Sequence, residues 1–227
     1  MKSADLKPHA PRLTTTSIEQ LPLKEIQLPQ GFKIEVWAHG IPGARMMARG
    51  ERGMVFVGSR IIGRVYAVSD KGDRRESRIL AEKLVQPNGI AMRDGNLYVA
   101  AINKVLRYDN IEAQLQGNPE TLPQPVDMTD KFGLPPDQHH GWKFLAFGPD
   151  GQLYMTHGVF TRAEVKDPAN ANEPAVRMDA AVARYNVQTK KFEVFADGTS
   201  NPWGVDFDRA GNAFLSACVI DHMFHMA

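Results

Sequence analysis

Two adjacent histidines, His139 and His140, precede a predicted hairpin in the segment DQHHGWKFLAFGPDGQLYMTHG, residues 137–158. Gly and Pro in its GPDG turn favour a tight connection between two antiparallel strands, 144–147 and 152–156. Proteins commonly place functional side chains on a loop that enters a rigid strand. A neutral histidine at such a place can act as a general base near pH 7 or bind a metal. We therefore expect His140 to be a functional residue.

The elements that position these histidines belong to a pattern that occurs four times. Each copy has a short apolar strand, a polar turn with a glycine, and a second strand with an aromatic or apolar pair. The copies cover residues 44–60, 88–104, 141–158 and 202–218, with turn glycines at Gly53, Gly95, Gly151 and Gly211. The glycine spacing lies within or just beyond the range of propeller blades, and four short strands per repeat make such a blade. A β-sandwich also spaces its turns regularly, but it does not repeat one four-strand unit.

Further strands complete the predicted blades. Third strands are expected at 63–69, 104–110 and 180–187, and fourth strands at 77–84 and 190–198. The sequence predicts an all-β propeller domain over residues 28–227, with about three complete four-stranded blades and the start of a fourth. The domain should begin with an alternating strand at Phe32–Val36, after a flexible extension at 1–27. Because propellers close with four to eight blades, we expect the N-terminal part of a six-bladed propeller, with residues 213–220 left as an unpaired edge.

The repeat alignment brings four polar residues to equivalent positions just before or at the first strand of each blade. These residues are Arg45, Asn88, His140 and Asn201. In a propeller the first strands line the central channel, so this ring is a candidate pocket, although Asn before a strand is also an ordinary turn former. Long loops at 111–138 and 159–179 should project from one face near this site.

Other chemistry-bearing residues are weaker candidates. His157 follows the second strand of its hairpin and can approach the ring from the side. Asp221, His222 and His225 have a spacing that would share one face of a helix, but the segment lacks the Glu of a metalloprotease motif. Cys218 is expected to be a buried small hydrophobe without a partner base. Trp142 and Trp203 could stack on a cofactor, but they are expected to pack in the core or at the rim.

Composition excludes several classes of protein. A formal net charge of +1 and the lack of a basic stripe give no reason to expect nucleic-acid binding. One cysteine rules out an intramolecular disulfide and a cysteine-based zinc site. No apolar run approaches the length of a membrane span, and the first 17 residues lack the apolar core of a secretory signal peptide.

Three ordered segments resemble a known family. LPQGFKIEVWAHGIPGARMMARGERGMVFVGSR, VQPNGIAMRDGNLYVAAINKVLRYDNI and HHGWKFLAFGPDGQLY, within residues 28–158, are similar to the glucose/sorbosone dehydrogenase family. Its members are six-bladed propellers that use pyrroloquinoline quinone (PQQ), usually with calcium. The tail, FEVFADGTSNPWGVDFDRAGNAFLSACVIDHMFHM, resembles dehydrogenase-like propellers of bacterial multidomain proteins with c-type haem modules.

The resemblance implies roles for particular residues. His140, eight positions before the first Gly of GPDG, matches the family's catalytic base, and Arg60 matches the Arg that closes the second strand. The Arg-Asn-Pro motif corresponds to Ser200, Asn201 and Pro202, so the Arg that lies over the quinone is replaced by Ser. A second departure follows the GPDG hairpin, where the family has a GxGD-like sequence and this chain has MTHGVF. Asn88 and Asn201, with Arg60, are the predicted cofactor-binding residues, whereas metal ligands are unknown and would lie beyond Ala227.

The resulting hypothesis is a PQQ-dependent sugar or aldose (sorbosone-like) dehydrogenase, in which hydride passes from a sugar carbon to the quinone and His140 is the general base. By the same resemblance, calcium, a c-type cytochrome or haem-domain electron acceptor and a periplasmic location are implied. Two alternatives remain: a non-catalytic binding or scaffold propeller, and a calcium-dependent lactonase-like hydrolase. For the lactonase, Asn88 and Asn201 qualify as ligands but the inner strand of the first blade offers no Glu. Expressed alone, the chain is expected to bind PQQ poorly or to self-associate.

Overall fold

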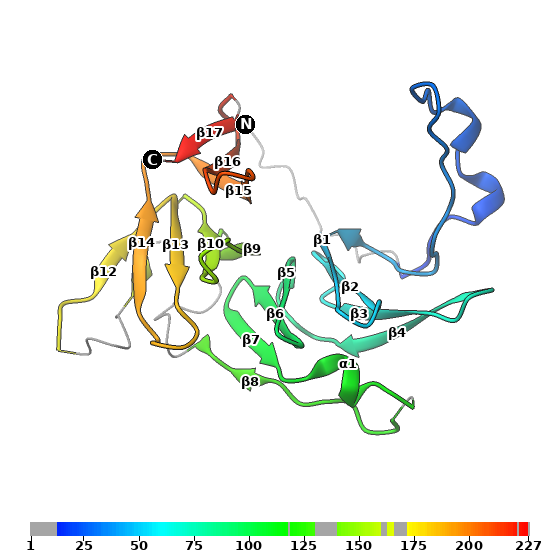
Figure 1. Ribbon diagram of the computed structural model, residues 1–227, viewed down its shortest axis with the longest axis horizontal. Coiled ribbons are helices and arrows are strands. Elements are labelled where there is room, and N and C mark those ends of the chain that lie inside the picture. The colour runs from blue at the N-terminus through cyan, green and yellow to red at the C-terminus, as the bar shows by residue number, and fades with distance from the viewer. Residues whose placement is uncertain are drawn as a thin grey trace, which may run out of the picture.

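Four antiparallel sheets of the chain follow one another around an arc, as the blades of a β-propeller do (Figure 1). The computed structural model describes residues 13–117, 119–129, 140–159, 163–165, 172–221 and 223–226. Three of the sheets have four strands and the last has three. The predicted all-β fold, with three complete blades and part of a fourth, is confirmed. Within the described ranges, no helix is long and apolar enough to cross a membrane.

The blades follow the predicted repeats closely. Blade 1 consists of β1 (Ala44–Arg49), β2 (Val55–Ser59), β3 (Val65–Asp70) and β4 (Arg75–Ala81). Blade 2 consists of β5 (Gly89–Arg93), β6 (Asn96–Ala101), β7 (Lys104–Tyr108) and β8 (Val126–Asp127). Blade 3 consists of β9 (Trp142–Phe147), β10 (Leu153–His157), β13 (Ala181–Tyr185) and β14 (Phe192–Ala196). Blade 4 contains β15 (Asn201–Phe207), β16 (Ala213–Cys218) and β17 (Met223–Met226).

The first strand of each blade is its inner strand. β1 contacts β5, β5 contacts β9, and β9 contacts β15, so the four inner strands stand side by side around one channel. All four begin at the same end of the channel, which we call the mouth. The four turn glycines lie at the opposite end, and each has a positive φ, as at Gly151 with φ +76°. A side chain there would be strained, which explains why each turn carries Gly.

Apolar side chains between neighbouring blades form the core. Phe56 of blade 1 packs with Ile90 and Leu97 of blade 2, and Tyr98 belongs to the cluster shared by blades 2 and 3. A third cluster joins Tyr154 of blade 3 to blade 4. Because a middle strand is covered on both faces, it reads as a continuous apolar run, and the buried residues of β6 (Leu97–Ala101) are of this kind.

Several sequence-based expectations about single strands were wrong. Phe32–Val36 belongs to no sheet, and the Phe32 side chain is 69% exposed, because alternation makes a strand only where a partner strand is available. Residues 213–220 do not form an unpaired edge, since β16 pairs with β15 on one side and with β17 on the other. His225 therefore lies on a strand rather than on a helix, while His139 and His222 lie outside the described residues.

The two long insertions do not leave the same face. The first begins with the short helix α1 (Ile111–Gln114) at the turn end of blade 2, and only its last residues return to the mouth through β8. The second joins the mouth ends of β10 and β13 and contains a small sheet of β11 (Ala163–Val165) and β12 (Val176–Met178). Only the second insertion fits the predicted position near the site. The N-terminal segment adds two 3-10 turns, η1 (Ile18–Gln20) and η2 (Leu23–Glu25).

Candidate functional site at the channel mouth

Three of the four inner strands carry one extra residue near the mouth. In β1, the partners of Ala44 and Met47 are Ser59 and Val57, so three steps along β1 match two along β2. The same mismatch occurs between Trp142 and Leu145 in β9 and between Pro202 and Gly204 in β15. These are β-bulges, which commonly redirect a side chain next to a functional site.

The extra residues are Arg45, Lys143 and Trp203. In β1 and β9 the other intervening side chains, Met46 and Phe144, pack against the core clusters, which leaves Arg45 and Lys143 outside the regular ladder. In β15, Trp203 alone lies between the two paired positions. The bulges thus place two cations and an aromatic ring at one place.

Trp203 lies at the centre of this cationic cluster. The Nζ of Lys143 is 4.9 Å from the centroid of the Trp203 ring, and the Cζ atoms of Arg45 and Arg60 are 5.1 and 5.9 Å from it. Such contacts stabilise a cation by attraction to the face of the ring. In the described part of the chain, none of these three cations forms a salt bridge. Among the described residues, the positive charge at the mouth is therefore not balanced by a carboxylate, which is the property of an anion-binding site.

Lys143 is the most buried of these cations. Its residue is 3% exposed, and its Nζ donates a hydrogen bond to Oδ1 of Asn201. Burial, opposed by Cys218 and aided by the positive charge of Arg60, lowers the pKa of the Lys143 amine to about 8. The amine therefore titrates close to physiological pH, unlike an exposed lysine.

The structure brings the predicted site residues together. Arg60, Asn88 and His140 line one small cavity, together with Gln86, Ile102, Lys143 and Trp203. Asn201 joins the group through its bond to Lys143. The enclosed volume is about 10 Å³, which is room for about one water molecule. Their roles remain predictions, but the proximity expected from the repeat alignment is present.

His140 has a defined tautomer when neutral. Its Nδ1 is 2.7 Å from the carbonyl oxygen of Val159. A carbonyl only accepts hydrogen bonds, so Nδ1 carries the proton and the lone pair is on Nε2. That assignment is the one a general base needs.

The other predicted ligands have structural partners. Nδ2 of Asn88 donates to the carbonyl oxygen of Lys143 over 2.9 Å, which fixes the β9 bulge to blade 2. Its Oδ1 is buried and, among the described atoms, has no partner. Nε of Arg60 donates to Oε1 of Gln86 over 2.8 Å. Asn88 therefore positions Lys143 and also offers one acceptor to the cavity.

Gly158 keeps this cluster compact. A Cβ at this position would lie 2.5 Å from Nζ of Lys143 and 2.6 Å from both Oδ1 of Asn201 and Cβ of His140. A real side chain would push these three groups apart. The glycine of the MTHG sequence after the hairpin is thus explained by steric constraint, because Gly158 lies against Lys143 and His140.

His157 lies behind the cluster and is not part of the cavity. It is fully buried, and its ring is 5.0 Å from that of Trp142 in an edge-to-face arrangement. Burial, together with the nearby charge on Lys143, lowers the pKa of His157 to about 4. His157 is therefore neutral at pH 7 and packs as part of the core.

The sequence reasoning missed Lys143, Trp203 and Gln86 as members of the site. Trp203 was expected to pack at the core or rim, and Lys143 was seen only as part of the HHGWK segment. The signal that identifies both is the bulge, which appears only once strand pairing is known. Within the described ranges there is also no group of three or more His, Cys, Asp or Glu side chains that could hold a metal ion.

Residues 19–226 match the family model described as a domain of unknown function, DUF7133. The chain belongs to the DUF7133 family. An uncharacterized protein of Borreliella burgdorferi is 25% identical to this DUF7133 chain over 194 residues, which cover 82% of the chain and 47% of that relative. The chain therefore spans about half the length of this curated relative.

Solved structures similar to the DUF7133 chain share its propeller fold. The PQQ-bound aldose sugar dehydrogenase from Streptomyces coelicolor is 22% identical, with a TM-score of 0.59 over 85% of this chain and 62% of that one. The PQQ domain of pyranose dehydrogenase from Coprinopsis cinerea is 15% identical, with a TM-score of 0.60 over 88% of this chain and 51% of that one. A putative gluconolactonase is also 15% identical, with a TM-score of 0.61 over 91% and 66%. At these identities the likeness shows the fold alone.

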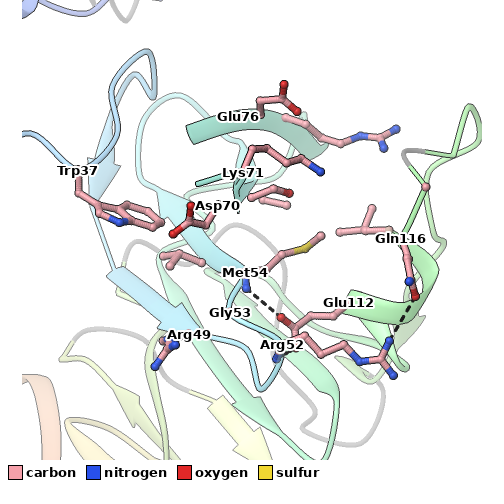
Figure 2. A pocket seen from close by; sticks show the side chains of 16 residues that line it. Trp37, Arg49, Arg52, Gly53, Met54, Asp70, Lys71, Glu76, Glu112 and Gln116 are labelled. Carbon is pink, nitrogen blue, oxygen red and sulfur yellow. Dashed lines mark hydrogen bonds between the residues drawn. The ribbon is translucent and has the colours of Figure 1, made fainter. Parts of the chain in front are cut away.

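A larger cavity lies at the turn end of blade 1 in the DUF7133 chain, away from the mouth. It has a volume of about 830 Å³ and lies between the blade 1 sheet and α1, with Trp37 at one side (Figure 2). Glu112 forms part of its wall, and its carboxylate accepts hydrogen bonds from the backbone N–H groups of Arg52 and Met54, each over 2.9 Å. Both oxygens of Glu112 are thus used to fix the β1–β2 turn, so this carboxylate is structural.

Proposed function

We propose that this DUF7133 chain provides the catalytic mouth of a PQQ-dependent sugar dehydrogenase, an oxidoreductase that acts on a sugar or aldose carbon. The observation that carries the proposal is the cluster of Arg45, Arg60 and Lys143, whose charge is not balanced by a carboxylate in the described residues, next to His140. PQQ carries three carboxylates, so it has the charge that this cluster lacks. A PQQ-bound aldose sugar dehydrogenase from Streptomyces coelicolor has the same propeller fold, so this fold is able to hold that cofactor.

The residues present fit such a cofactor by their chemistry. Guanidinium groups bind carboxylates through paired hydrogen bonds, so Arg45 and Arg60 would hold the acidic groups of the quinone. The unpartnered Oδ1 of Asn88 would accept a hydrogen bond from a ligand N–H or O–H group. When bound, PQQ supplies an ortho-quinone that can accept a hydride. His140 would hold the proton of the substrate hydroxyl on Nε2, because Nδ1 donates to Val159.

Binding requires Trp203 to move. An enclosed space of about 10 Å³ holds no molecule larger than water, and Trp203 is the side chain that fills the centre of the cluster. Its contacts with the cations are cation–π contacts, which carboxylates of a ligand can replace with stronger charge-assisted hydrogen bonds. Ligand binding is therefore expected to change the environment of Trp203.

One departure from the resembling family bears on catalysis. Ser200 stands where that family has Arg, and its hydroxyl donates to the carbonyl oxygen of Cys218 over 2.8 Å. The Ser200 side chain therefore joins β15 to β16, and positive charge at the mouth comes from Arg45, Arg60 and Lys143 instead. Calcium, a haem-domain electron acceptor and a periplasmic location remain predictions from the resemblance.

A titration with PQQ tests the proposal. At a free ligand concentration of about 100 times Kd, a site specific to the folded state adds about 2.7 kcal/mol of stability. For a chain of this size that corresponds to a rise in Tm of roughly 5–10 °C. In contrast to the sequence-based expectation of poor binding, the assembled cluster predicts a saturable rise in Tm together with a change in Trp fluorescence that Trp203→Phe removes. Citrate, a tricarboxylate without a quinone, serves as the anion control and is expected to bind more weakly.

Matched variants locate the site. Arg60→Gln should weaken PQQ binding by about tenfold or more, because it removes a charge-assisted contact worth about 1.5–3 kcal/mol. Arg64→Gln is the control, since Arg64 lies on the same β2–β3 connection but pairs with Glu82 at 3.8 Å, outside the cavity. Equal binding by citrate and PQQ, or equal loss in both variants, would contradict a quinone site at the mouth.

A non-catalytic binding propeller is the second candidate. The observation that favours it is the small volume of the cavity beside Trp203, about 10 Å³, combined with Ser200 at the position of the family's Arg. The two candidates differ in dye-coupled oxidation of aldoses by the PQQ-loaded protein. Turnover that His140→Ala abolishes without loss of PQQ binding supports the dehydrogenase, whereas saturable PQQ binding without turnover supports the binding module.

A further inference from the structure

We propose that Lys143 is a nucleophilic amine that condenses reversibly with small carbonyl compounds bearing a carboxylate. The proposal concerns a different reaction from quinone-dependent oxidation and does not depend on PQQ. Its basis is the position of Lys143 in the β9 bulge, where the amine is held at the mouth between Asn201 and the face of Trp203.

The surroundings of the amine favour its neutral form. Lys143 is buried, and Arg60 lines the same cavity, so both desolvation and a like charge disfavour the ammonium. Among the described residues, the other charged or titratable groups near it are His140, His157, Cys218 and, across the Trp203 ring, Arg45, and none of them is a carboxylate. A lysine in a desolvated site next to another cation is the arrangement that activates an amine as a nucleophile.

The charge state follows from the pKa. With a pKa of about 8, roughly a tenth of Lys143 is neutral at pH 7, compared with fewer than one in a thousand exposed lysines. The concentration of the reactive form is therefore roughly 200–300 times higher than for an ordinary lysine at that pH. The advantage disappears above about pH 10.5, where both kinds of lysine are neutral.

The neighbours of the amine define the class of ligand. Nε of Arg60 is used by Gln86, which leaves the terminal nitrogens of the guanidinium for a carboxylate. Arg45 reaches the same ring of Trp203 from blade 1 and offers a second guanidinium. The space of about 10 Å³ is too small for any such ligand while Trp203 is in place, so the ligand binds beside the amine only when Trp203 moves aside. These features fit a 2-oxo acid or glyoxylate.

The condensation needs no further reactant. The neutral Nζ of Lys143 attacks the carbonyl carbon, a C–N bond forms, and the carbonyl oxygen takes up a proton to give a carbinolamine. The C–O bond then breaks, water leaves, and an imine remains, with no change in oxidation state. His140 and Lys143 line the same cavity, and a Cβ at Gly158 would lie 2.5 Å from Nζ of Lys143 and 2.6 Å from Cβ of His140. The proposal assigns the proton transfer between nitrogen and oxygen to the His140 imidazole.

Reductive trapping of the whole chain with glyoxylate and cyanoborohydride tests the proposal. Trapping converts the imine to a carboxymethyl amine, and peptide mass mapping locates it. The exposed Lys24 and Lys83 serve as internal references in the same tube. At pH 7 we expect modification of Lys143 to be at least tenfold faster than that of the references, and the ratio should fall towards one above about pH 10. Trp203→Ala should raise the ratio, because it uncovers the amine.

Further variants test whether the modified amine is that of Lys143, and a second aldehyde tests whether the carboxylate is required. Lys143→Arg keeps the charge and should remove the modified peptide, whereas Lys104→Arg, on the outer part of blade 2, should leave it unchanged. Glycolaldehyde, which has no carboxylate, should react at Lys143 more slowly than glyoxylate. A ratio of one or less at pH 7, in both the wild-type chain and Trp203→Ala, overturns the proposal, and equal rates with glycolaldehyde overturn its carboxylate part. Since the trap contains no quinone, its result is independent of whether PQQ binds.

Discussion

Replacement of Lys143 by Met tests the electrostatic description of the mouth. Met keeps a long apolar stem and removes the amine. The folded-state pKa of about 8 lies below the ordinary value of 10.5, so the unfolded chain binds this proton more tightly. The folded state therefore carries the full cost of the buried charge below pH 8, and this cost is relieved as pH rises from about 8 to 10.5.

The size of the effect follows from that difference in pKa. At 1.36 kcal/mol per pKa unit, the penalty at pH 7 amounts to about 3 kcal/mol as an upper limit. The Met variant loses the hydrogen bond to Asn201, which offsets about 1–2 kcal/mol of the gain. We therefore expect Lys143→Met to be more stable than the wild type by about 1–2 kcal/mol at pH 7. For a domain of this size the Tm rises by roughly 2–8 °C.

Urea denaturation at pH 7 and at pH 10 measures this prediction. The difference between the two proteins is the informative quantity, since the other lysines and the tyrosines titrate in both. At pH 10 the Lys143 amine of the folded wild type is neutral, so most of the free-energy cost of burying its charge is relieved. Lys143→Met should therefore be the less stable protein at that pH. If the free energies of unfolding of the two proteins run parallel from pH 7 to pH 10, the amine is not held in a desolvated site and the reasoning fails.

Two further predictions concern buried polar groups outside the small cavity at the mouth. The folded-state pKa of His157 is about 4, below its ordinary value of 6.5, so the stability of the protein should fall as pH drops from about 6.5 towards 4. In thermal melts, His157→Phe should reduce this loss of stability. If the pH dependence of Tm is unchanged in the variant, His157 is not desolvated. Glu112→Gln should lower the free energy of unfolding, measured by urea denaturation, by about 1–3 kcal/mol, because charge-assisted bonds to two backbone N–H groups weaken. Glu76→Gln is the control at an exposed residue and should lower it by less than about 0.5 kcal/mol. Equal effects in the two Glu variants would argue against a structural role for Glu112.

The repeat pattern was sufficient to predict the fold because each blade carries its own local signals. Alternating and continuous apolar runs identify strands, and turn glycines such as Gly151 mark the hairpins between them. Strands that depend on a distant partner were not predictable in the same way. β17 is four residues long and β8 only two, and neither has a pattern until a neighbouring strand supplies the hydrogen bonds.

The candidate site was predictable in part for a similar reason. Asn88, His140 and Asn201 occupy equivalent positions in the repeats, so alignment of the repeats was enough to bring them together. Lys143 and Trp203 lie inside strands, where a count of alternating residues assigns them to one face or the other. Their actual direction depends on a mismatch between two paired strands, and a single strand's sequence does not contain that mismatch.

The bulges have a consequence for how such a protein can diversify. Deletion of Lys143 would leave Trp142 opposite His157 and Phe144 free to pair with Thr156, so the ladder and the core on both sides would survive. Deletion of Phe144 would instead remove a side chain that packs between blades 3 and 4. The extra residues at the bulges are thus not needed for the strand pairing or the core. In descendants of this chain, gain or loss of a single codon at a bulge can alter the chemistry of the channel while the architecture is inherited intact.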